Sequence, residues 1–301
     1  MSKISVPKLS TKTMLVLAGI VVLAVSSYAY FHSVYSSPAN VFERMISNSL
    51  SSPSVSKRIT QDDEVQKLVQ IINLQTSPQQ LVHTNSILTQ VNGGVETTKV
   101  TNESIGTLTA DFVRYVDIKT NQKNEKNLPF DFSSIINIWG KSEANTPTSS
   151  GAELFNQNVL GVVPTANISQ PVRGQLIGQI FEDGVYKYDK KTLKRKIENG
   201  RPVYVYEVSV QPVAYVTMLK SFAHALGLNQ LDQVDPSRYK GSQPLSFIFE
   251  IDVWSGQLTK ISYKDSSRSE SYGAYGARTR VNIPKDSIPV NELQTRLQQI
   301  R

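Results

Sequence analysis

The chain has 301 residues, of which 39% are hydrophobic and 19% charged, and its formal net charge is +7 at pH 7. This length and hydrophobic fraction suit one or two domains with a packed core. The absence of cysteine excludes disulfide scaffolds, thiolate metal sites, thiol enzymes and lipoproteins anchored through an N-terminal cysteine.

An uncharged apolar segment, residues 14–31, lies close to the N-terminus. As a helix it would be about 27 Å long, close to the hydrocarbon thickness of a bilayer. Lys3, Lys8 and Lys12 precede the segment, and no acidic residue accompanies them. Because positively charged flanks stay on the cytoplasmic side, the segment is predicted to span the membrane once, with the rest of the chain outside.

The predicted division is a cytoplasmic tail over 1–12, a transmembrane signal-anchor helix over 13–35 and a single extracytoplasmic domain over 36–301. The protein is then expected in the cell membrane, as a single-pass protein with a cytoplasmic N-terminus. A cleaved signal peptide, with its cleavage site at 27–29, and a buried core helix are the alternatives. An exported domain without disulfides is typical of bacterial cell envelopes.

A helix is predicted at the start of the domain, because Ser37 can cap it and Pro38 suits its first turn. One face of this helix is apolar and consists of Val41, Phe42, Met45 and Ile46. The next segment, 62–74, has apolar spacings that fit either a helix or a strand.

Antiparallel strands are predicted next, because the apolar period changes to two. The first pair, 81–91 and 95–101, flanks an Asn-Gly-Gly turn signal. In the following strand, 108–118, apolar and polar side chains alternate, which is typical of an antiparallel sheet with one buried side. A loop-rich insertion, 129–171, comes after it.

The second half of the chain is predicted to combine strands, hairpins and helices. The expected elements are strands over 175–181 and 185–188, a hairpin over 194–210, a helix over 212–226, a hairpin over 245–264, a strand over 279–283 and a helix over 289–300. Helices at the start and middle of many antiparallel strands predict the α+β class.

Catalytic and cofactor motifs are absent from the sequence. No HExxH, GxSxG, GxxxxGK or GxGxxG pattern occurs. The three histidines are His32, His83 and His224, and acidic pairs such as Asp62-Asp63 lie in turn-like segments. We therefore predict that the protein is not an enzyme and that it holds no metal and no cofactor.

Six basic residues fall within ten positions and are opposed only by Asp189. They are Lys187, Lys190, Lys191, Lys194, Arg195 and Lys196. One interpretation is a patch that binds anionic lipid head groups or an anionic envelope polymer. The other is a solvated hairpin whose lysines protect a sheet edge. Nucleic acid is not an expected partner, because the predicted location of the domain separates it from nucleic acid.

A second candidate recognition surface lies in the glycine- and serine-rich segment 264–280 and just before it. Its side chains are Tyr263, Tyr272, Tyr275 and Arg278, together with Arg268 and Arg280. Aromatic and arginine side chains in a mobile loop are favoured at recognition surfaces. A long hairpin connection without a ligand is the alternative interpretation.

A third candidate is the apolar face of the strand at 245–254. Its members are Phe247, Phe249, Ile251 and Val253. These side chains fit either the wall of a cavity for an acyl chain or an ordinary core.

The order of elements resembles that of the LolA/LppX-like envelope proteins. The resemblance is carried by the leading helix (38–50), the strand VYVYEVSV (203–210) that runs into a helix near Met218-Leu219, and the strand-turn-strand unit 247–261. It implies a curved antiparallel half-barrel closed by helices around an apolar cavity. The chain departs from the family in having no lipobox cysteine, a long insertion before 171 and the tyrosine-rich segment.

The predicted fold is therefore α+β, with an N-terminal transmembrane helix followed by a curved antiparallel half-barrel packed on a few helices. The predicted function is that of a membrane-anchored extracytoplasmic binding protein that holds a lipid or other amphiphile between sheet and helices. The alternative is a non-catalytic interaction or assembly module of the cell envelope, acting through the basic hairpin or the Tyr/Arg segment.

Overall fold

The computed structural model describes residues 20–23, 25–27, 29–143 and 153–300. The strands in these ranges form one sheet in the order β13-β6-β5-β4-β3-β2-β1-β12-β11-β10-β9-β7, with β8 paired to β9. All pairs are antiparallel except β13 with β6. The strands are β1 (Ser54–Asp62), β2 (Gln66–Gln75), β3 (Leu81–Asn92), β4 (Val95–Thr107), β5 (Ala110–Thr120), β6 (Gly140–Glu143), β7 (Tyr186–Tyr188), β8 (Lys194–Glu198), β9 (Arg201–Val210), β10 (Leu245–Asp252), β11 (Leu258–Tyr263), β12 (Ser269–Gly273) and β13 (Ile288–Pro289).

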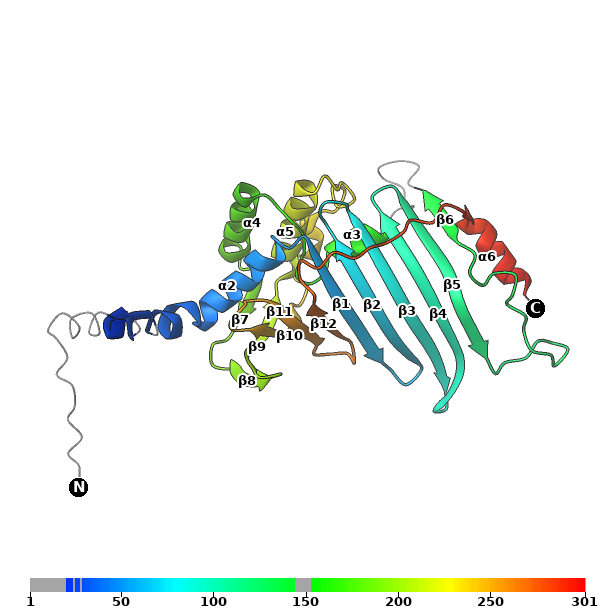
Figure 1. Cartoon of the computed structure of the whole chain (residues 1–301), viewed down its shortest axis with the longest axis horizontal. Helices are drawn as coiled ribbons and strands as arrows, with labels where there is room; N and C mark the ends of the chain where they lie inside the picture. Colours follow the sequence, from blue (N-terminus) through cyan, green and yellow to red (C-terminus); the bar gives the residue numbers. More distant parts are fainter. Residues whose placement is uncertain (1–19, 24, 28, 144–152, 301) are drawn as a thin grey trace, which may run out of the picture.

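The sheet is curved and open, and helices cover one part of it. The helices are η1 (Phe31–Tyr35), α2 (Pro38–Ser49), α3 (Leu154–Val159), α4 (Gln170–Glu182), α5 (Pro212–Ala225), η2 (Pro236–Tyr239) and α6 (Val290–Gln299). Figure 1 shows α2, α4 and α5 gathered beside β7 and β9–β12, whereas the long strands β1–β5 extend away toward β6 and α6. The predicted α+β class, with a curved antiparallel sheet on a few helices, is confirmed.

The start of the chain is described only in part. The predicted tail over 1–12 and part of the predicted anchor over 13–35 lie outside the described residues. Residues 20–23, 25–27 and 29–30 are helical and lead into η1. Among the helices of the described ranges, none is long and apolar enough to cross a membrane.

Helix α2 begins and packs as its sequence predicts. The Ser37 hydroxyl accepts a hydrogen bond from the backbone N–H of Asn40 (3.4 Å), and Pro38 occupies the first turn. The apolar stripe is buried in the main core, with Phe42 in ring contact with Tyr206 and Phe249. This core fills the space between α2, α4, α5 and the helix-covered face of the sheet.

The turn signals are also confirmed. The hairpin of β8 and β9 closes at Glu198 and Arg201, and Asn199 and Gly200 both have positive φ (50° and 75°). Two central residues with positive φ suit the right-handed twist of the strands that they join. Between β3 and β4, Gly93 and Gly94 do the same with φ of 57° and 82°.

The strand predicted over 175–181 is wrong, because this segment belongs to helix α4. Its two buried apolar residues are Leu176 and Ile180. A spacing of four places two residues on one face of a strand and also on one face of a helix, so the pattern did not discriminate. Pro171 in the first turn starts the helix.

In three further segments the structure differs from the predicted elements or decides between two alternatives. The ambiguous segment 62–74 mostly forms strand β2. The segment 264–280 is not one long loop, because β12 lies inside it and pairs with both β1 and β11. Residues 279–283 do not form the predicted strand. The strand that follows β12 is β13, which pairs with β6.

The outer face of the long strands carries its own small cluster. Ile105, Ala110 and Phe112 are buried there against Trp139 and Val281. Val281 belongs to the chain after β12, which runs across the long strands toward β6 (Figure 1). The two faces of the sheet therefore have separate cores, a large one under the helices and a small one under this C-terminal segment.

Candidate binding cavity

A cavity of about 450 Å³ lies between the helix-covered face of the sheet and helices α3 and α5. Its lining comes from β1, β2, β10, β11 and β12 on the sheet side, and from α3, the residues after α3 and Tyr215 of α5 on the other. This volume falls in the range of about 300–1,000 Å³ that is typical of small-molecule sites.

Strands β4 and β5 fix the position of α3 over the cavity. A Cβ atom on Gly106 of β4 would lie 2.6 Å from Cβ of Leu154 and 2.9 Å from the backbone nitrogen of Phe155, so only glycine fits. Asp111 Oδ2 accepts hydrogen bonds from the backbone N–H groups of Glu153 (2.7 Å) and Leu154 (3.1 Å). Burial raises the pKa of Asp111 to about 6, although these two hydrogen bonds act against it.

The floor of the cavity contains a buried carboxylate, Glu270 of β12, which is only 3% exposed. Its Oε1 accepts hydrogen bonds from Tyr263 (2.7 Å) and Arg268 (2.9 Å), and its Oε2 accepts one from Tyr272 (2.7 Å). Burial would raise the pKa of Glu270, but the charge of Lys57 and the hydrogen bonds outweigh burial and hold the pKa below its usual value. Glu270 is therefore ionised and accepts three hydrogen bonds.

Lys57 of β1 lies beside this carboxylate and is 6% exposed. Its Nζ donates to the backbone oxygen of Asn158 (3.0 Å), and within the described ranges it forms no ion pair. Burial lowers the pKa of Lys57, the charge of Glu270 opposes this, and the charge of Arg268 adds to it. An ammonium group has three N–H donors, so two donors of Lys57 remain without a protein acceptor in the described part of the chain.

Arg268 supplies a second incompletely bonded cation. One of its terminal nitrogens bonds Glu270, and its guanidinium lies 5.0 Å from the centre of the Tyr263 ring. Its Nε is buried and has no hydrogen-bond partner among the described residues. Since leaving a buried donor unpaired costs about 1–3 kcal/mol, this atom and Lys57 Nζ favour an acceptor from a ligand.

The remaining wall of the cavity is mixed. Apolar side chains line it at Ile59, Ile72, Leu160, Val162 and Phe247, and the polar Gln70, Gln157 and Asn158 lie among them. The arrangement is suited to a ligand with an apolar part against this wall and a hydrogen-bond acceptor at Lys57 and Arg268.

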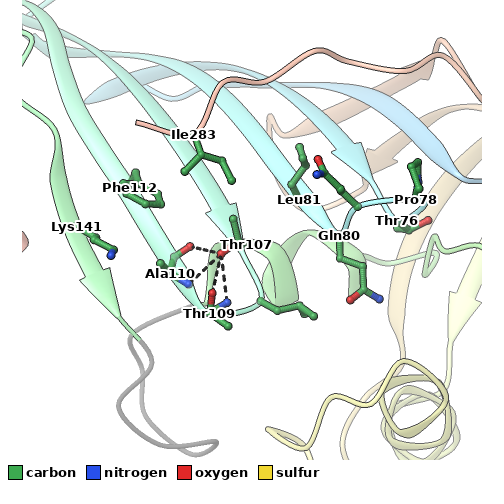
Figure 2. A pocket seen from close by; sticks show the side chains of 12 residues that line it. Thr76, Pro78, Gln80, Leu81, Thr107, Thr109, Ala110, Phe112, Lys141 and Ile283 are labelled. Carbon is green, nitrogen blue, oxygen red and sulfur yellow. Dashed lines mark hydrogen bonds between the residues drawn. The ribbon is translucent and has the colours of Figure 1, made fainter. Parts of the chain in front are cut away.

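A second hollow, of about 540 Å³, lies at the ends of the long strands (Figure 2). Among its polar groups, Thr107 Oγ1 accepts from the backbone N–H groups of Thr109 (3.2 Å) and Ala110 (3.0 Å) and donates to the carbonyl of Ala110 (3.0 Å). Its charged side chain, Lys141, is paired with Glu143. This outer hollow is larger than the inner cavity, but its charged side chain already has an ionic partner.

The six basic residues of the predicted patch are exposed and lie together on β7, β8 and the turn between them. Lys196 is ion-paired with Glu198 (3.0 Å) and Glu250 (2.7 Å), which reduces its share of any free positive charge. A shallow hollow of about 400 Å³ adjoins this region and is lined by Lys187 and Tyr188, among others. The structure thus brings the predicted basic residues together at one sheet edge.

The predicted Tyr/Arg residues are divided between two places. Tyr263 and Tyr272 lie on β11 and β12, where both bond Glu270. Tyr275 is largely buried and donates to the backbone oxygen of Leu258 (2.8 Å). Arg278 is exposed in the segment that follows. Tyr263, Tyr272 and Tyr275 are therefore part of the folded interior rather than of a mobile loop.

Sequence reasoning missed Lys57 and Glu270. Lys57 had a readable signal, because it falls between Val55 and Ile59 on the inward face of a strand, where an apolar residue is expected. Glu270, between Ser269 and Ser271, gave no such signal.

No protein-family model matches the chain, and no curated protein matches it. Among solved structures, the chain is similar to LprF from Mycobacterium bovis, with a TM-score of 0.41, 10% sequence identity, and coverage of 82% of this chain and 98% of LprF. It is also similar to a beta-barrel-like protein of a domain of unknown function from Brucella abortus, with a TM-score of 0.25, 8% identity, and coverage of 74% and 96%. The weak resemblance predicted from the order of elements is confirmed as a weak one.

Within the described ranges, no group of three or more His, Asp or Glu side chains is arranged to hold a metal ion.

Proposed function

We propose that this protein binds a lipid or other amphiphile in the cavity under α3 and α5, without catalysing a reaction on it. The observation that carries the proposal is that one cavity combines apolar lining side chains with two incompletely bonded cations, the buried Lys57 and the partly exposed Arg268. Each methylene group of a bound chain would contribute about 0.8 kcal/mol through its removal from water. The polar end of the ligand would supply the acceptors that burial has taken from the two cations.

A binding role also agrees with the state of Glu270. The carboxylate accepts three hydrogen bonds, and its pKa lies below the usual value, so it is a weak proton acceptor. General-base catalysis favours a group whose pKa lies near the working pH. Glu270 is therefore better suited to holding Tyr263, Tyr272 and Arg268 in place than to proton transfer.

We further propose that the N-terminal segment anchors the protein in the cell membrane as a single span, with a cytoplasmic N-terminus and the folded domain outside. The proposal is supported by the lysines that precede the apolar segment and by exposed apolar side chains in its described part, at Ile20, Val21, Val22 and Leu23. Aromatic side chains at Tyr30 and Phe31 are also exposed, as suits a membrane interface.

Contacts at the end of this segment would hold the domain in a fixed orientation. Arg44 donates hydrogen bonds to the backbone oxygens of Tyr35 (2.6 Å) and Val253 (2.8 Å) and lies 3.6 Å from the centre of the Tyr35 ring. The Tyr35 hydroxyl donates to the backbone oxygen of Trp254 (2.9 Å). The segment is thus joined to the turn after β10 rather than through a free linker.

The cavity is tested by filling it. Full-length protein kept soluble in an amphipol is titrated with a nitrobenzofurazan-labelled dodecanoate, and fluorescence is followed. Leu160→Trp places an indole in the inner cavity, and we expect it to lose saturable binding. The matched control, Leu108→Trp, fills the outer hollow and should bind as the wild type does. Wild-type binding by a folded Leu160→Trp variant would overturn the proposal.

A second function, as an envelope assembly module, is favoured by one observation, the exposed basic residues grouped on β7 and β8. Its test is sedimentation of the protein with an anionic cell-wall polymer. The triple variant Lys190→Glu, Lys191→Glu, Lys194→Glu should sediment less than the wild type, and an unchanged pellet would count against it. Stability should stay within about 0.5 kcal/mol of the wild type, since the replaced side chains are exposed.

A further inference from the structure

The inner cavity carries a surplus of positive charge. Its charged lining residues are Lys57, Arg268 and Glu270, so two cations face one carboxylate. Glu270 accepts hydrogen bonds from Arg268 and two tyrosines, and its single negative charge also acts on Lys57, which within the described ranges forms no ion pair at contact distance. The cavity therefore has one positive charge that the protein itself leaves unpaired.

Such a surplus is unfavourable in an empty cavity. Removing a charge from water without a partner costs several kcal/mol, and proteins ordinarily pair buried charges or neutralise them. Here the two cations also act on each other, because the charge of Arg268 contributes to lowering the pKa of Lys57. A group that enters with one negative charge would relieve both effects at once.

We propose that the ligand of this cavity carries one oxyanion group with a single negative charge, bound by Lys57 Nζ and Arg268 Nε, while its apolar chain lies along Ile72, Leu160 and Phe247. This assignment rests on the proposed function of the cavity as an amphiphile site. A neutral head group would leave Lys57 unpaired, and a doubly charged one would place an excess anion beside Glu270. The shared chemistry is that of a fatty-acid carboxylate or the phosphodiester of an anionic phospholipid.

The test compares two ligands that differ only in the head group. Full-length protein in an amphipol is titrated calorimetrically with decanoate and with decanol at pH 7. Lys57→Met removes the surplus cation and keeps the volume of the side chain. We expect the affinity for decanoate to fall about tenfold, because one charge-assisted hydrogen bond is lost, and the affinity for decanol to stay the same or rise.

The matched control is Lys264→Met, which removes an exposed lysine that is paired with Glu207 outside the cavity. It should leave both affinities unchanged. Lys57→Met should fold, because replacing a buried charge by an apolar side chain of similar size is often neutral or stabilising. Its midpoint of thermal unfolding confirms this before titration.

The outcomes separate the inference from the function on which it rests. Equal affinity of the wild type for decanoate and decanol, or an unchanged decanoate affinity in Lys57→Met, overturns the anionic head group but leaves the amphiphile site standing. Failure of both ligands to bind overturns both. The source of the anion is then resolved with palmitate, phosphatidylglycerol and phosphatidylcholine. Palmitate binding or phosphatidylglycerol binding supports the inference and names the source, and equal or tighter binding of phosphatidylcholine contradicts it.

Discussion

Two ionic networks lie on opposite faces of the same sheet and are built differently. The outer network joins β3, β4 and β5. His83 Nε2 lies 2.8 Å from Glu103 Oε1, and Arg114 Nε donates to Glu103 Oε2 at 2.8 Å. Arg114 also lies over the ring of Trp139, 4.7 Å from its centre. Each charged group of the outer network thus has a direct partner within the protein.

The inner network joins β1 and the segment from Arg268 to Glu270. Here the Glu270 carboxylate accepts three hydrogen bonds. Among the described residues, Arg268 Nε has no hydrogen-bond partner, and Lys57 Nζ donates only to a backbone oxygen. A network in which every charged group has a protein partner stabilises the fold. A network in which one cation has no anionic partner in the protein is expected to bind a ligand. The comparison therefore points to the inner face as the functional one.

The largest expected effect comes from removing the centre of the inner network. Glu270→Gln leaves the buried Lys57 and the partly exposed Arg268 without a carboxylate, and we expect the free energy of unfolding to fall by about 3–5 kcal/mol. Urea denaturation monitored by tyrosine and tryptophan fluorescence measures the loss. Adding Lys57→Met to the same chain should recover part of it. A loss below about 1 kcal/mol would show that the inner network is no more critical than a surface ion pair.

The roof of the cavity gives the next largest effect. Gly106→Ala forces a Cβ against Leu154 and Phe155, and should destabilise the protein by about 1–3 kcal/mol and weaken decanoate binding. The matched control is Gly174→Ala in α4, where a Cβ meets no atom within 4 Å. Because alanine favours a helix more than glycine does, this control should be neutral or stabilising. Equal effects of the two substitutions would contradict the close approach of α3.

The outer network should contribute less. Glu103→Gln is expected to cost about 1 kcal/mol at pH 7, since the network is only partly buried. Burial would raise the pKa of Glu103, but hydrogen bonds from His83 and Arg114 outweigh it and lower the pKa. Its contribution is therefore present above the ordinary pKa of glutamate and is lost as pH falls through the lowered native value. Denaturation at pH 7 and pH 3 should show the variant and wild type converging in acid.

Asp111 should show the smallest effect, with the opposite sign. Burial raises its pKa from 3.8 to about 6, so the native state is favoured by protonation and loses stability as pH rises through about 6. Asp111→Asn keeps an acceptor for the first turn of α3 and removes the buried charge. We expect a gain of about 1 kcal/mol at pH 7, discounted for partial exposure, and little change at pH 4. A loss at pH 7 would mean that the hydrogen bonds to α3 outweigh burial.

Local sequence patterns predicted an element correctly where capping, turn and apolar-spacing signals agreed. Helix α2 has a cap, a first-turn proline and an apolar stripe, and the β8–β9 hairpin has Asn199-Gly200 at its tip. Helix α4 was predicted as a strand because Leu176 and Ile180 satisfy both periods. The outcome there depends on packing against other helices, which the local sequence does not contain.

The candidate site was less accessible to sequence reasoning. Its residues come from β1 and from the distant, consecutive strands β11 and β12, and their meeting depends on β12 pairing between β1 and β11. Tyr263 and Tyr272 were singled out for their residue type, but their burial on Glu270 could not be predicted without that pairing. Lys57 on an inward strand position was the one available signal.

The central claim, that the inner cavity holds an amphiphile, is tested most directly by native mass spectrometry of the full-length protein purified from the cells that express it. The account predicts one lipid-sized adduct on the wild type and on Leu108→Trp, and none on a folded Leu160→Trp variant. An unliganded wild type that also fails to take up added decanoate, or an adduct of equal abundance on all three proteins, would contradict it.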